Sequence, residues 1–343
     1  MKTWKRILAL TLSVLMILGC FTACGGGEQK ETEPVVTEDP VEAKTLKVLT
    51  LGHSLAVNST RMLNLVAHAE GYEEMTIGTL YYSGCPLNKH VQFMNNNSPE
   101  YKLYISSTTT ANEAPKSLDN VTMLQAIEYD YWDIIIMQGG TFEIAEDETY
   151  KSGAIQQIQK YVNENKKNPN AVFGWHLPWA FATDPELQAL GSYGEGYKKY
   201  DNDRRKFFDA SAQCVKEHIM TDSTFTCLIP SGAAVENAIS SYMTEKDILC
   251  DYAHAADFGR LIAAYTWYCV LTGVDKLEEI KVDAIPARFV ATSIVTGDRV
   301  LTEDDKALIL ESVNNALANP LQITESQYKE EPEGYVPVMN KDG

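Results

Sequence analysis

The chain has 343 residues, and its 47 acidic side chains outnumber 29 basic ones to give a formal charge of −18 at pH 7. A protein that binds nucleic acid needs a clustered basic surface to neutralise phosphates, so this composition argues against a nucleic-acid partner. The roughly 300 residues from Leu46 onward are compatible with one large domain.

The first 24 residues have the pattern of an export signal, because basic Lys2, Lys5 and Arg6 precede an apolar run from Ile7 to Gly19. A single transmembrane anchor is the alternative, but a membrane span needs roughly 20 apolar residues and this run is shorter. We therefore predict a signal peptide over residues 1–24 that is not part of the fold.

Small residues lead into Cys20 and into Cys24, and both sites resemble the lipobox of bacterial lipoproteins, whose cysteine is lipidated and becomes the new N-terminus. Cys24 is the favoured site, with Cys20 as the alternative, because a polar acidic tether over residues 25–44 begins directly after Cys24. This pattern predicts a lipoprotein held in the lipid bilayer at the extracellular face of the bacterial cell membrane.

Apolar runs of strand length alternate with amphipathic stretches along the rest of the chain. The predicted strands are 46–51, 75–81, 132–138, 171–176 and 225–230. The predicted helices are 59–70, 147–165, 202–220, 234–242 and 258–271. This alternation predicts an α/β domain over 45–320, with a central parallel sheet between two helical layers, and a C-terminal tail over 321–343.

The segment 89–128, between the second and third predicted strands, is too long for a simple connection. The alternation of polar and apolar residues from Tyr101 to Ser106 indicates part of an antiparallel hairpin. We expect this hairpin to lie beside the site and to shape the substrate cleft.

Ligands of open parallel sheets bind beyond the carboxyl ends of the strands, so the residues after each strand are the place to look for chemistry. The first strand ends in Gly52-His53-Ser54, and the second is followed by Gly84. The third strand ends at Gln138.

A second informative feature lies about 200 positions downstream of Ser54, where Asp251 stands three residues before His254. That spacing lets one short turn hold a carboxylate beside an imidazole. A serine just past a strand and a histidine with its own aspartate are the parts of a serine hydrolase. Ser54 would attack the ester, His254 would act as base and then as acid, and Asp251 would orient the imidazole.

The developing oxyanion of such a reaction needs hydrogen-bond donors. Three donors are candidates: the backbone N–H of Ser54, the backbone N–H of Gly84, and the side-chain amide of Gln138. Glycine at the ends of three strands (Gly52, Gly84, Gly139 and Gly140) brings backbone close to the reacting carbonyl and indicates a shallow pocket for a small acyl group.

The order of these residues across the chain resembles the SGNH or GDSL hydrolase superfamily, with Gly-x-Ser after the first strand and Asp-x-x-His before the last helix. The resemblance spans about 47–273 and is closest to a bacterial branch labelled as a domain of unknown function, on the segments 82–87 and 229–234 and on Trp267-Tyr268. It implies a flavodoxin-like three-layer fold and hydrolase chemistry. Two positions depart from the superfamily's usual pattern, because His53 replaces Asp or Asn and Gln138 replaces Asn.

Each candidate also has a purely structural interpretation. Ser54 could be a helix N-cap, and Asp251 could cap the last helix while His254 is a buried histidine. Gly84 could serve only a turn that needs positive φ, and Gln138 could satisfy the sheet edge without touching substrate.

Metal binding is a further alternative, through Cys250, Asp251, His254 and His176, but no Cys/His pair shows the repeated close spacing of a structural zinc site. We therefore predict neither a metal nor a cofactor. Five cysteines lie beyond the signal, and an odd number without close pairing argues against a disulfide framework.

Histidines and tryptophans near the strand ends are candidate pocket residues: His53, Trp175, His176 and Trp179. The aromatic rings suit stacking on a sugar. Together these observations predict an esterase that removes O-acetyl or other small acyl groups from extracellular carbohydrate. The alternative is a glycan-binding lipoprotein with weak catalysis on the same scaffold, and a lipase is less favoured because no strongly apolar lid is evident.

Overall fold

The computed structural model describes residues 44–111, 113–191, 194–287 and 298–335. Seven strands form one sheet in the order β4-β3-β2-β1-β5-β6-β7. Their bounds are β1 (Thr45–Gly52), β2 (Glu74–Tyr81), β3 (Tyr101–Ser107), β4 (Lys116–Val121), β5 (Ile134–Met137), β6 (Val172–His176) and β7 (Phe225–Ile229).

Five of these strands, β1, β2, β5, β6 and β7, run parallel to one another. Numbered among themselves in chain order, they stand as 2-1-3-4-5, which is the flavodoxin-like arrangement. Their carboxyl ends therefore meet at one edge of the sheet. The predicted strands and the predicted fold class are confirmed, with strand bounds shifted by no more than a few residues.

Beyond the central parallel strands, β3 pairs antiparallel with β2, and β4 pairs antiparallel with β3. The hairpin predicted within 89–128 thus extends the sheet at its β2 edge. Antiparallel strands can be joined by a short connection, whereas a further parallel strand would need another crossover.

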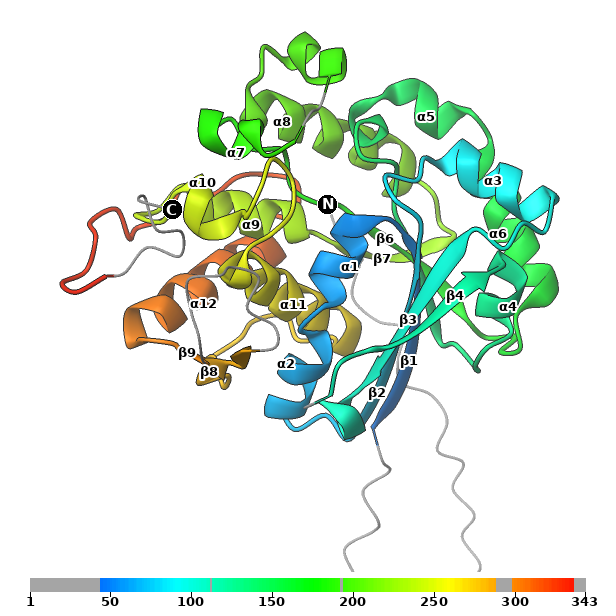
Figure 1. Cartoon of the computed structure of the whole chain (residues 1–343), viewed down its shortest axis with the longest axis horizontal. Helices are drawn as coiled ribbons and strands as arrows, with labels where there is room; N and C mark the ends of the chain where they lie inside the picture. Colours follow the sequence, from blue (N-terminus) through cyan, green and yellow to red (C-terminus); the bar gives the residue numbers. More distant parts are fainter. Residues whose placement is uncertain (1–43, 112, 192–193, 288–297, 336–343) are drawn as a thin grey trace, which may run out of the picture. The chain divides into compact units, whose positions relative to one another are not determined.

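Helices cover both faces of the sheet (Figure 1). One face carries α1 (Ser54–Thr60), α2 (Leu63–Ala69), α9 (Ser231–Ile239), α11 (Asp257–Thr272) and α12 (Glu303–Ala318). The other carries α3 (Leu87–Asn95), α4 (Met123–Ile127), α5 (Asp147–Lys151) and α6 (Ala154–Asn165). The connection from β6 to β7 contains α7 (Pro185–Ala189) and α8 (Arg204–Cys214).

Shorter elements complete the described chain. These are α10 (Glu245–Ile248), the pair β8 (Ala284–Ile285) and β9 (Arg299–Val300), the 3₁₀ helices η1 (Thr108–Thr110), η2 (Glu143–Ala145) and η3 (Gly194–Tyr200), and the π-helical turn η4 (Val215–Ile219).

Two predicted helices differ from the structure in informative ways. The first was expected over 59–70, but α1 already begins at Ser54 and a break at 61–62 separates it from α2. The helix expected over 147–165 is divided into α5 and α6 by Gly153, whose φ of 77° is left-handed. Glycine adopts this conformation without the steric cost that a Cβ would bring.

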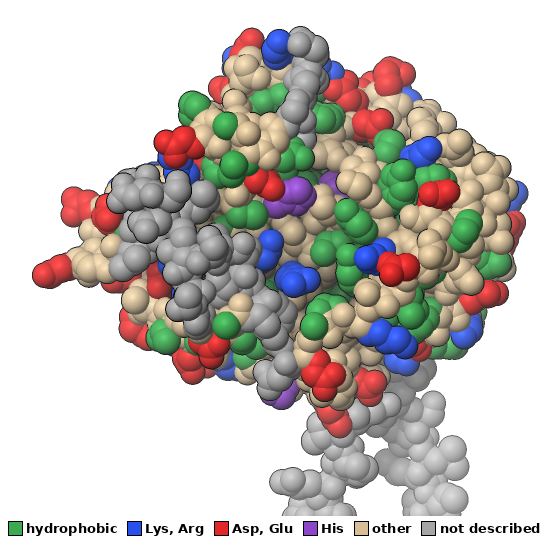
Figure 2. All heavy atoms as spheres, in the orientation of Figure 1, with side chains coloured by type: hydrophobic (Ala, Val, Ile, Leu, Met, Phe, Trp, Pro, Cys, Tyr) green, Lys and Arg blue, Asp and Glu red, His purple; other side chains and the backbone are tan. Residues whose placement is uncertain are grey.

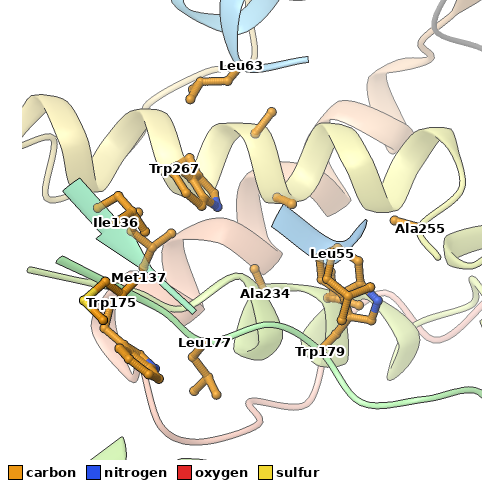
Figure 3. Close-up of a cluster of buried hydrophobic side chains, with 14 of the residues drawn as sticks. Leu55, Leu63, Ile136, Met137, Trp175, Leu177, Trp179, Ala234, Ala255 and Trp267 are labelled. Carbon is orange, nitrogen blue, oxygen red and sulfur yellow. The ribbon is translucent and has the colours of Figure 1, made fainter. Parts of the chain in front are cut away.

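The core lies between the sheet and both helical layers. Figure 3 shows Leu55 of α1 and Trp267 of α11 in the same buried cluster as Ile136 and Met137 of β5. These side chains are 0–1% exposed, and burying a large apolar side chain stabilises the fold by about 1.5–3 kcal/mol. Continuous apolar strands such as β5 are what a sheet covered on both faces requires.

The segment predicted as a C-terminal tail packs against the domain in its described part, 321–335. The N–H of Thr324 donates to Asn237 Oδ1 of α9 at 2.6 Å, and the N–H of Tyr242 donates to the carbonyl of Tyr328 at 2.8 Å. The domain therefore extends beyond residue 320.

The predicted signal peptide, the lipidation sites Cys20 and Cys24, and nearly all of the tether lie outside the described residues. Within the described ranges, no helix combines the length and apolar character needed to cross a membrane. The five cysteines of the described domain are free thiols: Cys85, Cys214, Cys227, Cys250 and Cys269. Over the face shown in Figure 2, acidic side chains are widely spread and basic ones do not merge into one continuous patch.

Candidate active site

Ser54 is the first residue of α1, directly beyond the carboxyl end of β1, and its side chain is half-buried. The helix is capped by His53, whose Nδ1 accepts a hydrogen bond from the N–H of Leu55 at 3.4 Å. Ser54 is therefore not the N-cap that the structural interpretation required. The N–H groups of the first turn have no partner within the helix, so the N–H of Ser54 is available to a ligand.

Asp251 and His254 form a hydrogen-bonded pair, with Asp251 Oδ2 2.7 Å from His254 Nδ1. The other carboxylate oxygen accepts from the backbone N–H groups of Ala253 at 2.8 Å and His254 at 2.7 Å. The carboxylate is thus fixed by its own turn, and His254 Nδ1 carries the proton it donates. Helix α11 begins at Asp257 with Ala256 as its N-cap, so Asp251 does not cap that helix.

Burial raises the pKa of Asp251, but the hydrogen bonds from the His254 side chain and from two backbone amides outweigh it and hold the pKa below its ordinary value. Asp251 is therefore a carboxylate at neutral pH. The side chain of His254 is 28% exposed, which leaves the imidazole open to a substrate.

The loop that carries this pair is held by the rest of the fold at several points. Within the loop, Cys250 N–H donates to the carbonyl of His254 at 2.8 Å. From the segment after β6, Ala182 N–H donates to the carbonyl of Tyr252 at 2.9 Å, and Trp179 Nε1 donates to the carbonyl of Ala253 at 2.7 Å. A residue positioned in this way needs little reorganisation when it reacts.

Asn58 joins this loop to α1, the helix that begins at Ser54. Its Oδ1 accepts a hydrogen bond of 2.7 Å from the N–H of Ala255, the residue after His254. Because Asn58 stands four positions after Ser54, both side chains lie on one face of α1. The structure therefore places His254 at the face of α1 that presents Ser54.

Between the described side chains of Ser54 and His254 no direct hydrogen bond is formed. Such contacts are often loose without substrate and tighten in the reacting complex.

Gly84 lies in an exposed turn after β2, with a φ of 57° that favours glycine. A Cβ on Gly84 would meet one neighbour within 4 Å, Thr141 Oγ1 at 3.4 Å. Close by, a Cβ on Gly140 would come within 2.7 Å of Pro86 Cα. The loops after β2 and β5 are therefore packed backbone to backbone, and the hydroxyl of Thr141, which the sequence analysis missed, lies beside the predicted oxyanion donor. Its position shortly after a predicted strand could have indicated Thr141 from the sequence.

Gln138 does not lie at the surface turn that holds Gly84. The residue is fully buried, and its side-chain amide lies between two histidines, with Nε2 2.8 Å from His53 Nε2 and Oε1 3.4 Å from His176 Nδ1. The prediction that Gln138 donates to the oxyanion therefore needs correction, because its polar atoms are engaged in the core.

One proton arrangement satisfies this buried network. His53 Nδ1 accepts from Leu55, so Nε2 carries the proton and donates to the carbonyl of Gly139 at 3.1 Å. The amide of Gln138 then turns its oxygen toward His53 and its NH₂ toward His176, an exchange of O and N that the geometry permits. His176 Nε2 donates to Ser59 Oγ at 3.3 Å, and Ser59 Oγ donates to the carbonyl of Leu55 at 2.8 Å.

Both histidines in this network are neutral. Burial lowers the pKa of His53 to about 4, against a raising effect of its bond to Gly139. Burial, with the charge of His53 as a smaller cause, lowers the pKa of His176 to about 3. The network joins the start of α1 to the ends of β5 and β6.

The predicted pocket residues are corrected by the same burial. Trp175 and Trp179 are 0% and 1% exposed and belong to the core cluster drawn in Figure 3. His53 and His176 are 0% exposed. None of the four presents a ring to a bound sugar, because each side chain is enclosed in the core. Trp179 instead supports the loop that carries His254.

Two of the residues considered as metal ligands already form other hydrogen bonds. His176 uses both ring nitrogens in the buried network, and Cys250 Sγ donates to the carbonyl of Ala255 at 3.6 Å. Among the described residues, one group has the spacing of metal ligands, Asp147, Glu217 and His218, but Asp147 already bonds Lys151 and His218.

Comparisons with known proteins agree with this fold. A family model described as DUF4886, a domain of unknown function, matches residues 47–293. The crystal structure of a DUF4886 family protein from Bacteroides uniformis ATCC 8492 is similar with 25% identity and a TM-score of 0.68, over 83% of this chain and 100% of that chain. A candidate SGNH hydrolase from Slackia heliotrinireducens has 15% identity and a TM-score of 0.39, over 66% of this chain and 99% of that chain. No curated protein matches the chain.

Proposed function

The chain belongs to the DUF4886 family, and from its site we propose that it is a serine esterase, tethered at the cell surface, that removes small acyl groups from extracellular carbohydrate. The observation that carries this proposal is the Asp251 to His254 hydrogen bond of 2.7 Å, in a loop bound to the face of α1 that presents Ser54. A protein that only binds a glycan has no need of this arrangement.

The reaction follows from the positions of the three side chains. Ser54 Oγ bonds to the ester carbonyl carbon while His254 Nε2 takes the hydroxyl proton, and Asp251 stabilises the resulting imidazolium. His254 then returns the proton to the leaving alcohol as the ester C–O bond breaks. Water, deprotonated by His254, attacks the acyl-serine, and the carboxylate leaves as Ser54 regains its proton.

The oxyanion is stabilised by the N–H groups of Ser54 and Gly84 and by the hydroxyl of Thr141, which lies 3.4 Å from the position that a Cβ on Gly84 would take. Removing one such donor typically lowers kcat by about 10²–10³-fold. Thr141 takes the role that the sequence analysis gave to Gln138.

A small acyl group is favoured by the packing around the oxyanion donors. Because Gly140 and Pro86 approach at the backbone level, the loops after β5 and β2 leave little room for a long chain between them. The formal charge of −18 disfavours anionic lipid headgroups as a substrate surface.

The test is a chain-length series of 4-nitrophenyl esters, assayed beside acetylated xylan and acetylated mannan. The proposal predicts the highest kcat/KM for acetyl esters and release of acetate from at least one glycan. A preference for acyl chains of eight or more carbons, without acetate release, would overturn it in favour of a lipase or thioesterase.

A further inference from the structure

An open groove of about 470 Å³ lies at the carboxyl end of β2, beside the candidate active site. Its lining combines aromatic, charged and amide side chains: Tyr81, Tyr82, Glu100, Lys102, Asp119 and Asn120. The groove has no role in the reaction described above.

The sheet register places this groove next to the nucleophile. Tyr81 pairs with Gly52, two residues before Ser54, and the N–H of Tyr82 donates to the carbonyl of Gly52 at 3.4 Å. The chain continues from Tyr82 through Ser83 into Gly84. The groove therefore borders the turn that holds an oxyanion donor.

Tyr81 also lies on the face of the sheet that carries α1. Residues two apart on a strand share a face, so Tyr81 points to the same side as Thr79. Thr79 Oγ1 lies 3.0 Å from Thr60 Oγ1 of α1. Since Ser54 begins α1, the ring of Tyr81 stands on the nucleophile's side of the sheet.

The hairpin supplies the polar half of the groove. Lys102 of β3 pairs with Tyr81 in the register and forms an ion pair of 2.9 Å with Asp119 of β4. Neighbouring Glu100 adds a second carboxylate. Two carboxylates against one ammonium repel a negatively charged ligand, and the same groups are donors and acceptors for hydroxyls.

The rings are held in place by their neighbours. The centroids of Tyr81 and Tyr104 are 6.0 Å apart, and Tyr82 packs edge-on against Phe93 at 4.9 Å. Tyr81 and Tyr82 are each partly exposed. A fixed, partly exposed aromatic ring beside carboxylates and an amide suits a sugar, whose apolar face stacks while its hydroxyls bind polar groups.

We propose that this groove binds the sugar unit that carries the scissile ester, and that it selects uncharged sugars over acidic ones. This rests on the proposed function, since the sugar is the leaving group of that reaction. Tyr81 thereby replaces Trp175 and Trp179 as the proposed surface for stacking on the sugar.

The test is titration calorimetry of the Ser54→Ala protein with acetylated xylotetraose, in three forms: otherwise unchanged, with Tyr81→Ala, and with Tyr131→Ala. Tyr131 is a matched control because it is 49% exposed and precedes β5, at the amino ends of the parallel strands and away from the groove. We expect Tyr81→Ala to weaken binding about tenfold or more, as loss of an aromatic stacking contact does. Tyr131→Ala should change the affinity less than about twofold.

Equal affinity in the two tyrosine variants, absence of binding, or tighter binding of oligogalacturonate than of xylotetraose would each overturn the proposal. Hydrolysis of ethyl acetate by the unmodified protein is measured separately, because it needs the reacting groups but no sugar. If the unmodified protein hydrolyses ethyl acetate but the two tyrosine variants bind the sugar equally, the groove proposal is rejected and the esterase proposal is kept. Sugar binding lost in Tyr81→Ala, with no ester hydrolysed, rejects the esterase and keeps the groove.

Discussion

At the scale of single residues, Asp251 is the most constrained group of the site. One oxygen accepts two backbone N–H groups and the other accepts His254 Nδ1–H, so the carboxylate has a single orientation. This contact was predictable from the sequence because it is local: three residues and one turn decide it. The burial of Gln138 was not predictable, because it depends on His53 at the start of α1 and His176 in β6, which are distant in the sequence.

Asp251→Asn should lower kcat by up to about 10⁴-fold, and by less than Ser54→Ala, while the fold is kept. The carbonyl of Asn can still accept the two backbone N–H groups, but its NH₂ then meets His254 Nδ1 and favours the tautomer that cannot take the serine's proton. Steady-state kinetics on 4-nitrophenyl acetate measure this. Asp275→Asn, at an exposed position, is the control, and a kcat for Asp251→Asn equal to the control's would show that the carboxylate does not orient His254.

At the scale of elements, α1 is joined to the sheet by the buried chain His53, Gln138 and His176, with Ser59 at its end. The alternation of strands and helices predicted the sheet, because each apolar run has the length of one strand. The start of α1 was missed by five residues, because a histidine N-cap has no strong sequence signal compared with Ser, Thr, Asp or Asn. The burial of Trp175 and Trp179 was missed because core and sugar-binding surfaces both use aromatic residues.

The neutral histidines of this chain predict how stability depends on pH. In the unfolded chain each imidazole has a pKa near 6.5, whereas the folded values are about 4 for His53 and about 3 for His176. The unfolded chain therefore binds more protons between these values, and the free energy of unfolding falls as the pH falls through this window. The slope is up to about 1.4 kcal/mol per pH unit for each histidine.

His176→Asn should remove its share of that slope, as measured by urea unfolding between pH 7 and 4.5. The slope is the readout, not the absolute stability, because any change at this buried position lowers stability at every pH. A slope identical to that of the unmodified protein would mean that His176 is not a neutral buried imidazole.

At the scale of the whole molecule, the described domain places its candidate site residues at the carboxyl ends of the strands of a single sheet. The family match confirms the expected relation to a branch labelled as a domain of unknown function. Order along the chain made this predictable, because the carboxyl ends of parallel strands meet whatever their separation in sequence. Attachment to a membrane concerns residues outside the described domain and stays a prediction.

Metabolic labelling with a palmitate analogue in a bacterial host tests that attachment. We expect label on the unmodified protein and on Cys20→Ala, and its loss in Cys24→Ala, because the polar tether begins directly after Cys24. Loss only in Cys20→Ala would move the lipid to Cys20. Label that persists when both cysteines are replaced would contradict the lipid anchor.

The central claim is that His254 activates Ser54, and a fluorophosphonate probe tests it most directly, since such probes bond covalently only to an activated serine. The account predicts one labelled peptide, containing Ser54, with labelling lost in Ser54→Ala and slowed by at least about 10³-fold in His254→Ala. Ser223→Ala, at an exposed serine before β7, should label like the unmodified protein. Labelling of another serine, or labelling of Ser54 at the same rate in His254→Ala, would contradict the account.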